Sequence, residues 1–261
     1  MANKINLREL VLNILLEIDK EGQYSHLVLR NTLEKYQYLE KKERAFITRI
    51  CEGTLEYRIR LDYILDQFST VPADKMKPVI RELLRSSVYQ LLYMDHVPDS
   101  AVCNEAVKLA RKRGFYNLTG FVNGVLRRIV REYGSIHFPE KNSPVEYLSV
   151  IYSMPVWLVE RFLKEYDFAT TEKMLESFLE TQPATIRIRE YQTEEEAVLE
   201  SLKEEKVTVE KAPYVDRAYY VKNYDYLPAL TAFRRGSIQV QDVSSMLAGE
   251  IAGVKEGDYV I

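Results

Sequence analysis

The sequence has few of the features that mark disulfide-linked, zinc-binding or membrane proteins. Its 261 residues contain two cysteines, Cys51 and Cys103, which stand far apart without a CxxC or CxxH pattern. This excludes a disulfide framework and supports no zinc site. No apolar run approaches the ~18 residues that a membrane-spanning helix requires, and polar residues interrupt the first apolar stretch, residues 5–18. We therefore expect a protein of a reducing cytoplasm without a membrane span or a secretory signal.

The common catalytic motifs are also absent. GxGxxG, GxxxxGK[ST], HExxH and GxSxG do not occur, which removes the usual signatures of nucleotide, zinc and hydrolase sites. His26, His96 and His137 lie in separate segments without an acidic partner at catalytic spacing. Both cysteines fall on apolar stripes, where a buried, inert thiol is expected. We assign no catalytic residue, cofactor-binding residue or metal ligand to this chain.

Charge is distributed unevenly along the chain. Residues 1–135 contain 22 Lys and Arg against 17 Asp and Glu, whereas residues 136–261 contain 14 against 22. With 46% apolar residues, the chain can build two compact domains, and the charge difference indicates that the two parts are distinct. The basic excess of the first part is compatible with contact to nucleic acid, and equally with an ordinary solvated helical surface.

Residues 1–135 predict helices throughout, because apolar residues return every three or four positions. The expected helices are separated by glycine and proline, which are typical of helix ends. Six or seven helices with short loops predict an orthogonal bundle. Their expected starts are near Leu7, Ser25, Glu40, Asp62 and Pro78, at Asp99 or Ser100, and at Thr119, with Gly22, Gly114 and Gly134 among the terminators.

The pattern changes after Gly134. Three prolines interrupt residues 136–182, which we interpret as a linker and a helical lead-in. A small α+β domain is expected over 183–235, with the order β-α-β-β. Its elements are a strand at 185–189, a helix at 193–204 and strands at 207–211 and 218–221.

Residues 236–261 are interpreted as the start of a further, truncated domain. A strand is expected at 237–241, and a helix begins at Asp242 or Ser244. Residues 258–261 are typical of the start of a buried parallel strand, yet one strand cannot build a doubly wound sheet. The alternative is that these last residues are a frayed terminus or an edge strand of the preceding domain.

Three clusters of basic residues could contact the phosphates of a structured RNA. In the helix after Thr119, three arginines and Gly124 share one face at i, i+3, i+4 and i+7, and the glycine leaves that face bare. Guanidinium forks suit phosphate oxygens. The alternative is an ordinary charged surface in which cations complement helix dipoles. The candidates are Arg127, Arg128 and Arg131 first, Arg111, Lys112 and Arg113 second, and the i, i+4 pair Arg81 and Arg85 third.

Some of the 19 tyrosines could stack on unpaired bases. The candidates are Tyr89, Tyr93, Tyr219 and Tyr220. No RNP signature accompanies the last two, so packing in a core is the preferred interpretation.

Several stretches together resemble the Sun/Fmu family of bacterial 16S rRNA cytosine-C5 methyltransferases. Residues 89–94, 97–98, 104–107 and 120–128 (GFVNGVLRR) are similar to the NusB-like domain of that family. Residues 152–159 and 183–187 are similar to its middle, RRM-like region. Gly236 with QDVSS at 241–245 resembles the segment that leads into its methyltransferase core.

The resemblance implies a multi-domain protein. An all-α NusB-like bundle (1–135) and a lead-in (136–182) would precede a small α+β RRM-like domain (183–235) and the first strand of a truncated Rossmann-like methyltransferase domain (236–261). The parent enzyme would use S-adenosylmethionine and two cysteines beyond Ile261, one of which attacks C6 of cytosine. This chain would bind and position 16S rRNA as a cytoplasmic monomer, without metal, membrane or catalysis.

Two departures from the family pattern weaken any expectation of RNA contacts in the middle region. The family usually has Arg-Val-Asn where this chain has Arg187-Ile188-Arg189, and Pro-Gly-Phe where it has residues 230–233. Two other functions stay open: a stand-alone antitermination-type RNA-binding module, and a protein-binding scaffold that docks a helix on the Gly124 face.

Overall fold

The computed structural model describes residues 5–180, 182–189 and 194–259. The chain divides into two compact units, a helical unit over residues 1–180 and a sheet unit over residues 181–261. Each unit is described by itself. The expected change from helices to an α+β domain therefore falls close to the predicted boundary at residue 183.

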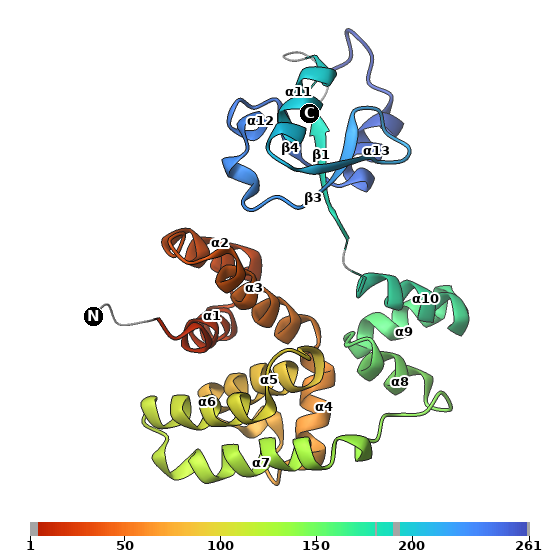
Figure 1. The fold of residues 1–261 in the computed structure, drawn as a ribbon. Coiled ribbons are helices and arrows are strands. Elements are labelled where there is room, and N and C mark those ends of the chain that lie inside the picture. The colour runs from red at the N-terminus through yellow and green to blue at the C-terminus, as the bar shows by residue number, and fades with distance from the viewer. Residues whose placement is uncertain (1–4, 181, 190–193, 260–261) are drawn as a thin grey trace. The chain divides into compact units, whose positions relative to one another are not determined.

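Seven α-helices build the first part of the helical unit, as the apolar periodicity predicts (Figure 1). Their apolar faces meet in one continuous core, whose largest fully buried side chains include Leu12, Ile50 and Leu84. The helices are α1 (Leu7–Glu21), α2 (Ser25–Lys35), α3 (Lys41–Glu56), α4 (Arg58–Phe68), α5 (Pro78–Tyr93), α6 (Asp99–Lys112) and α7 (Thr119–Arg131).

Local sequence signals explain most of the helix ends. Asn6 caps α1 by accepting a hydrogen bond from the Glu9 backbone N–H (3.1 Å), and Gly22 ends the helix with φ +59°. Pro78 occupies the first turn of α5. Helices α6 and α7 start at Asp99 and Thr119, as expected, but neither residue caps its helix, because Pro98 and Leu118 occupy the cap positions.

Three further helices form the lead-in expected after the bundle. They are α8 (Pro144–Ile151), α9 (Val156–Glu165) and α10 (Phe168–Phe178). Their own small core contains Leu148, Val159 and Leu175. Ser153, in the turn between α8 and α9, accepts a hydrogen bond from the Ile59 backbone N–H (3.1 Å) and so joins the lead-in to α4.

The sheet unit holds a four-stranded antiparallel sheet with strand order β2-β3-β1-β4. Apolar residues of β1 and β3 alternate with the strand period, and Ile186, Ile188, Tyr219 and Val221 pack on the helical layer on one side of the sheet. Its elements are β1 (Ala184–Ile188), α11 (Glu195–Glu204), β2 (Thr208–Lys211), β3 (Ala218–Lys222), α12 (Thr231–Arg234), β4 (Ile238–Val240) and α13 (Val243–Ala252).

The small domain extends beyond its predicted end at residue 235. Strand β4 pairs with β1, with Ile188 opposite Ile238, and so completes the same sheet. Helix α13 covers the second face, where Met246 is fully buried beside Val215 and Ala218. Residues 237–252 are thus integral to the sheet unit. Asp258 and Tyr259 do not lie in a strand, and Val260 and Ile261 lie outside the described residues, as does Thr193, the predicted start of α11.

Candidate nucleic-acid interface

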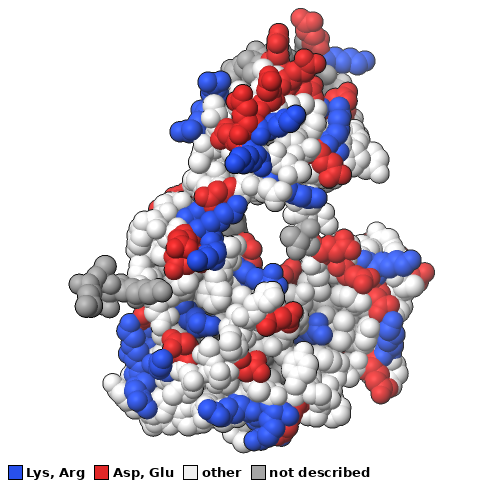
Figure 2. Space-filling view, viewed as in Figure 1, with Lys and Arg blue, Asp and Glu red and all other residues white. Residues whose placement is uncertain are grey.

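The exposed face of α7 carries the arginines that the sequence singled out. Val122, Val125, Leu126 and Ile129 are buried in the bundle core, which turns the opposite face to solvent. Figure 2 shows Lys and Arg side chains along the edge of the helical unit where Figure 1 places α7. A Cβ atom added to Gly124 would meet no atom within 4 Å. The face is therefore bare at that position, as predicted.

The three arginines of α7 differ in how far their charge is already neutralised. Arg128 and Arg131 both bind Glu132, at 3.0 and 2.9 Å, and these contacts hold the pKa of the Glu132 carboxyl below its usual value. Arg127 donates instead to the neutral Asn123 side chain, from Nε to Oδ1 at 2.9 Å. Arg127 is consequently the arginine of this face whose charge is most available to a ligand.

A groove of about 490 Å³ lies between α6 and α7 beside Arg127. Two cations, two amides and a hydroxyl belong to the residues that line it, and apolar surface makes up about half of the lining. The Lys108 side chain is 71% exposed and forms an ion pair with Glu105 at 2.7 Å. This ion pair, together with a hydrogen bond from Asn6, lowers the pKa of the Glu105 carboxyl. The lining residues are Asn104, Val107, Lys108, Thr119, Gly120, Asn123 and Arg127.

Asn104, Asn123 and Thr119 were missed as site residues because helix periodicity alone does not show which polar side chains meet across two helices. The available signal was their position in or beside the two family-like stretches, 104–107 and 120–128. Amide and hydroxyl groups contact phosphate and sugar oxygens as readily as they cap helices. The groove is thus suited to hold a phosphate-sugar backbone.

The second predicted cluster, at the end of α6, is divided between surface and structural roles. Arg111 is exposed, and its side chain forms no hydrogen bond or ion pair within the described part of the chain. Lys112 binds Glu9 at 2.5 Å, and Arg113 contacts Asn13 and lies 3.6 Å from Glu9. The last two residues therefore join α6 to α1, and only Arg111 extends the exposed basic surface.

The third predicted pair, Arg81 and Arg85, does not contribute to an RNA surface. The Arg85 side chain is 4% exposed and binds both oxygens of Asp62 as well as Glu82. Arg81 binds Asp19 at 2.7 Å and is 16% exposed. Helix α5 lies at the centre of the bundle, so these guanidiniums face other helices. Their assignment as RNA-binding residues was wrong.

The four tyrosines proposed for base stacking pack inside the protein, in agreement with the preferred interpretation. Tyr89 and Tyr93 stack with a ring distance of 5.2 Å, and burial raises the pKa of Tyr93 to about 12. Tyr219 is buried in the sheet unit and hydrogen-bonds Glu195. Tyr220 packs beneath α13. The sheet face that could have stacked bases is thereby covered.

Neither cysteine has the surroundings of a nucleophile. Cys51 and Cys103 are both buried, and desolvation raises the pKa of each thiol. A nucleophilic cysteine needs the opposite, a lowered pKa in an electropositive and accessible site. This agrees with the expectation of inert core thiols.

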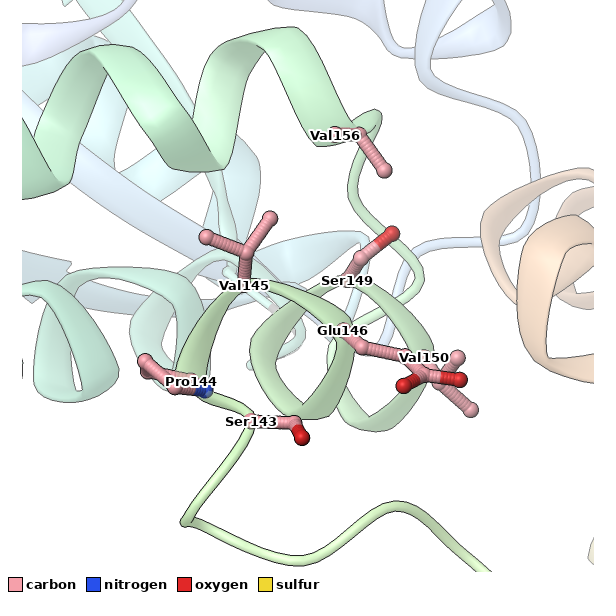
Figure 3. A pocket seen from close by; sticks show the side chains of 7 residues that line it. All are labelled: Ser143, Pro144, Val145, Glu146, Ser149, Val150 and Val156. Carbon is pink, nitrogen blue, oxygen red and sulfur yellow. The ribbon is translucent and has the colours of Figure 1, made fainter.

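A second hollow in the helical unit, of about 410 Å³, offers no catalytic chemistry. Its lining is almost wholly apolar and comes from α8, the residue before it and the first residue of α9 (Figure 3). Glu146 is its single ionisable group. Within residues 5–180, 182–189 and 194–259, no cluster of three His, Cys, Asp or Glu could hold a metal ion, and no helix is long and apolar enough to cross a membrane.

Comparison with known proteins agrees with both units. The NusB family model matches residues 5–131. The model described as "Methyltr_RsmF/B-like, ferredoxin-like domain" matches residues 154–224. A probable ribosomal RNA small subunit methyltransferase B of Bacillus subtilis is 32% identical over 99% of this chain. Both units thus match the domains that the resemblance to the Sun/Fmu family implies.

Other curated relatives match over a similar span. A probable ribosomal RNA small subunit methyltransferase B of Synechocystis is 31% identical over 95% of the chain, and a Yersinia pestis protein named ribosomal RNA small subunit methyltransferase B is 25% identical over all of it. The chain spans 55–58% of the length of these curated relatives, including the Bacillus protein.

A solved structure shares the fold. The crystal structure of PH0851 aligns with 98% of this chain and 57% of its own length, with a TM-score of 0.72 and 21% sequence identity. The matched span includes the helical unit and the sheet unit. The fold predicted from the family resemblance, a mostly helical NusB-like region followed by a small antiparallel-sheet domain, is confirmed.

Proposed function

We propose that this chain is the RNA-binding part of an S-adenosylmethionine-dependent methyltransferase that modifies a cytosine of 16S rRNA at C5. The observation that carries the proposal is the identity of 32% over 99% of the chain with a relative named as a small subunit rRNA methyltransferase. The exposed α7 face and its groove supply the cationic and amide groups that such a role requires.

The surface of α6 and α7 would bind the RNA backbone and not read bases. Arg127 provides the main available charge at the groove, and Lys108 adds a second cation that also pairs with Glu105. Asn104 and Asn123 provide neutral donors beside them. Gly120 and Gly124 have no side chain to hold a sugar-phosphate strand away. Contacts of this kind fix the orientation of an RNA, which is the task of a positioning domain.

Methyl transfer itself would take place outside this chain. In the proposed reaction a cysteine thiolate attacks C6 of the cytosine, which makes C5 nucleophilic towards the methyl donor. Cys51 and Cys103 are buried with raised thiol pKa values, so neither supplies that thiolate. Incubation of the chain with labelled S-adenosylmethionine and 16S rRNA should transfer no label. Measurable transfer would contradict this part of the proposal.

The RNA-binding part is tested with the double substitution Lys108→Gln and Arg127→Gln. We expect a weaker affinity for transcribed 16S rRNA and a salt dependence that is flatter by about 0.7 to 0.9 for each lost phosphate contact. Fluorescence anisotropy at several KCl concentrations measures both quantities.

The matched control is Arg161→Gln with Lys164→Gln, which removes two positive charges from α9 in the same unit. Its affinity and slope should stay close to those of the unmodified chain. Equal losses in both double variants would show that only net charge matters, and an unchanged slope in the α6–α7 variant would remove this surface from the proposal.

A further inference from the structure

The arginines of the sheet unit fall into two groups. Five arginines occur among its described residues. Arg187 pairs with Glu250 at 3.4 Å and Arg217 with Glu195 at 3.7 Å. The other three are exposed and form no ion pair with a carboxylate within the described part of the chain; they are Arg189, Arg234 and Arg235.

Strand pairing brings these three arginines to one turn. The Arg189 backbone N–H donates to the Ser237 carbonyl oxygen (3.0 Å), so the end of β1 lies beside the turn that joins α12 to β4. Arg234 and Arg235 stand immediately before Gly236 in that turn. The residues are some 45 positions apart in sequence, and only the β1–β4 register makes them neighbours.

The surroundings leave the three charges open to an external anion. The Arg189 guanidinium contacts the neutral Gln239 side chain, from Nη2 to Oε1 at 3.3 Å. A Cβ on Gly236 would lie 3.9 Å from Arg189 Nη1, and φ of +72° favours glycine there. No side chain therefore stands between Arg189 and the backbone of the turn.

A purely local role does not account for this cluster. Cations at a helix C-terminus complement the helix dipole, but α12 is a single turn of four residues with little dipole to complement. No carboxylate among the described residues pairs with Arg189, Arg234 or Arg235, although Figure 2 shows acidic side chains gathered where α11 lies. Three exposed guanidiniums without carboxylate partners at one turn are therefore available to a polyanion.

We propose that Arg189, Arg234 and Arg235 form a second RNA phosphate-binding patch, on the sheet unit and separate from the α6–α7 groove. The inference rests on the proposed RNA-binding function. Guanidinium forks match phosphate oxygens in bidentate geometry. Because α13 covers Tyr220 and the sheet face around it, the unit contacts the RNA backbone at its edge and does not stack bases on its sheet.

The test compares three variants of the full chain in binding to transcribed 16S rRNA. The first is Arg234→Gln with Arg235→Gln. The second is Arg189→Asn, which introduces the residue usual in the family. The control is Lys211→Gln with Lys222→Gln, which removes two charges that lie 3.8 Å from Asp216 and Glu210. Circular dichroism melting verifies that each variant is folded.

We expect the Arg234 and Arg235 variant to lose about tenfold in affinity at 0.1 M KCl and about 1.4 to 1.8 in salt slope, for two lost phosphate contacts. Arg189→Asn should lose about half of that slope, and the lysine control should bind within about twofold of the unmodified chain. An unchanged slope in both arginine variants would overturn the patch.

Two further outcomes separate this inference from the function on which it rests. If the Lys108 and Arg127 variant weakens binding while the Arg234 and Arg235 variant does not, the patch is refuted and the RNA-binding function stands. If the unmodified chain does not bind 16S rRNA, both fail. As a further check, polyglutamate and unlabelled rRNA are compared as competitors at equal charge concentration. If polyglutamate competes as strongly as rRNA, the site is not specific for RNA and an acidic protein partner is indicated.

Discussion

At the scale of single residues, the structure separates arginines that look alike in sequence. Arg81 and Arg85 stand at i, i+4 on α5, and Arg127 and Arg131 stand at the same spacing on α7. Arg85 is buried against Asp62 and Glu82, whereas Arg127 faces solvent beside a groove. The same pattern of charge therefore forms buried ion pairs in one helix and leaves an exposed basic face in the other.

The substitution Arg85→Met should lower the free energy of unfolding by about 3–5 kcal/mol, because it leaves the Glu82 carboxylate buried without its main counter-charge. Chemical denaturation measures this loss. Arg127→Met, at the surface, should change the stability by less than about 0.5 kcal/mol. Similar effects of the two substitutions would contradict the burial of the Arg85 network.

The Arg85→Met deficit should also depend on pH. Burial raises the pKa of the Glu82 carboxyl, and Arg85 opposes that rise. Without Arg85 the pKa rises further, so the folded variant binds a proton more readily than its unfolded chain. The loss in free energy of unfolding caused by Arg85→Met is therefore largest above the raised pKa of Glu82. It becomes smaller as the pH falls towards the ordinary pKa of a Glu side chain. Denaturation of both proteins at pH 8 and pH 5 tests this; a deficit that grows on acidification would contradict it.

At the scale of elements, helix packing decides what a glycine can accept. Gly53 of α3 lies against the Tyr89 ring, and a Cβ there would come within 2.0 Å of the ring carbon Cζ. Gly124 of α7 has no neighbour within 4 Å. Both glycines interrupt an apolar periodic pattern in the same way, so the sequence alone does not distinguish a close approach of two helices from an open face.

Gly124→Ala should raise the free energy of unfolding by about 0.5–1 kcal/mol, because alanine loses less backbone entropy in a helix. Gly53→Ala should lower it by about 1–3 kcal/mol through overpacking against Tyr89. Thermal melting should show a higher melting temperature for Gly124→Ala and a lower one for Gly53→Ala than for the unmodified chain. A destabilised Gly124→Ala protein would show that another group covers the α7 face.

At the scale of the whole molecule, the sheet unit is completed by a segment that the sequence analysis placed in another domain. Residues 237–252 were expected to begin another domain, yet β4 extends the sheet and α13 covers its second face. The β-α-β-β unit alone would leave Ala218 and Tyr220 exposed on that face. Whether the last residues also lead into a methyltransferase core stays a prediction.

Met246→Ala should destabilise the sheet unit by about 2–5 kcal/mol, since Met246 is fully buried between α13 and the sheet. The helical unit has its own core and should be unaffected. Hydrogen exchange resolved along the chain is the measurement: amides of β1 and β3 should lose protection while those of α5 keep theirs. Equal loss in both units would show that they unfold as one.

Much of the fold follows from the sequence, because apolar periodicity and caps act over a few residues. The starts of α1, α2 and α5, the end of α1 at Gly22 and all four strands lie within a residue or two of their predicted positions. The inert cysteines follow from the same apolar stripes. The exposed arginine face of α7 was predictable because it depends on one helix only: once the apolar residues identify the buried side, the opposite side must face solvent.

Only the tertiary structure decided which charges are available to a partner. The pairing of Arg85 with Asp62, the groove between Asn104 and Asn123, and the meeting of Arg189 with the turn at Gly236 all join residues that are distant along the chain. A periodic pattern reports which side of an element is apolar. It does not report which other element lies against that side, and that neighbour determines whether a guanidinium is neutralised or left open to a ligand.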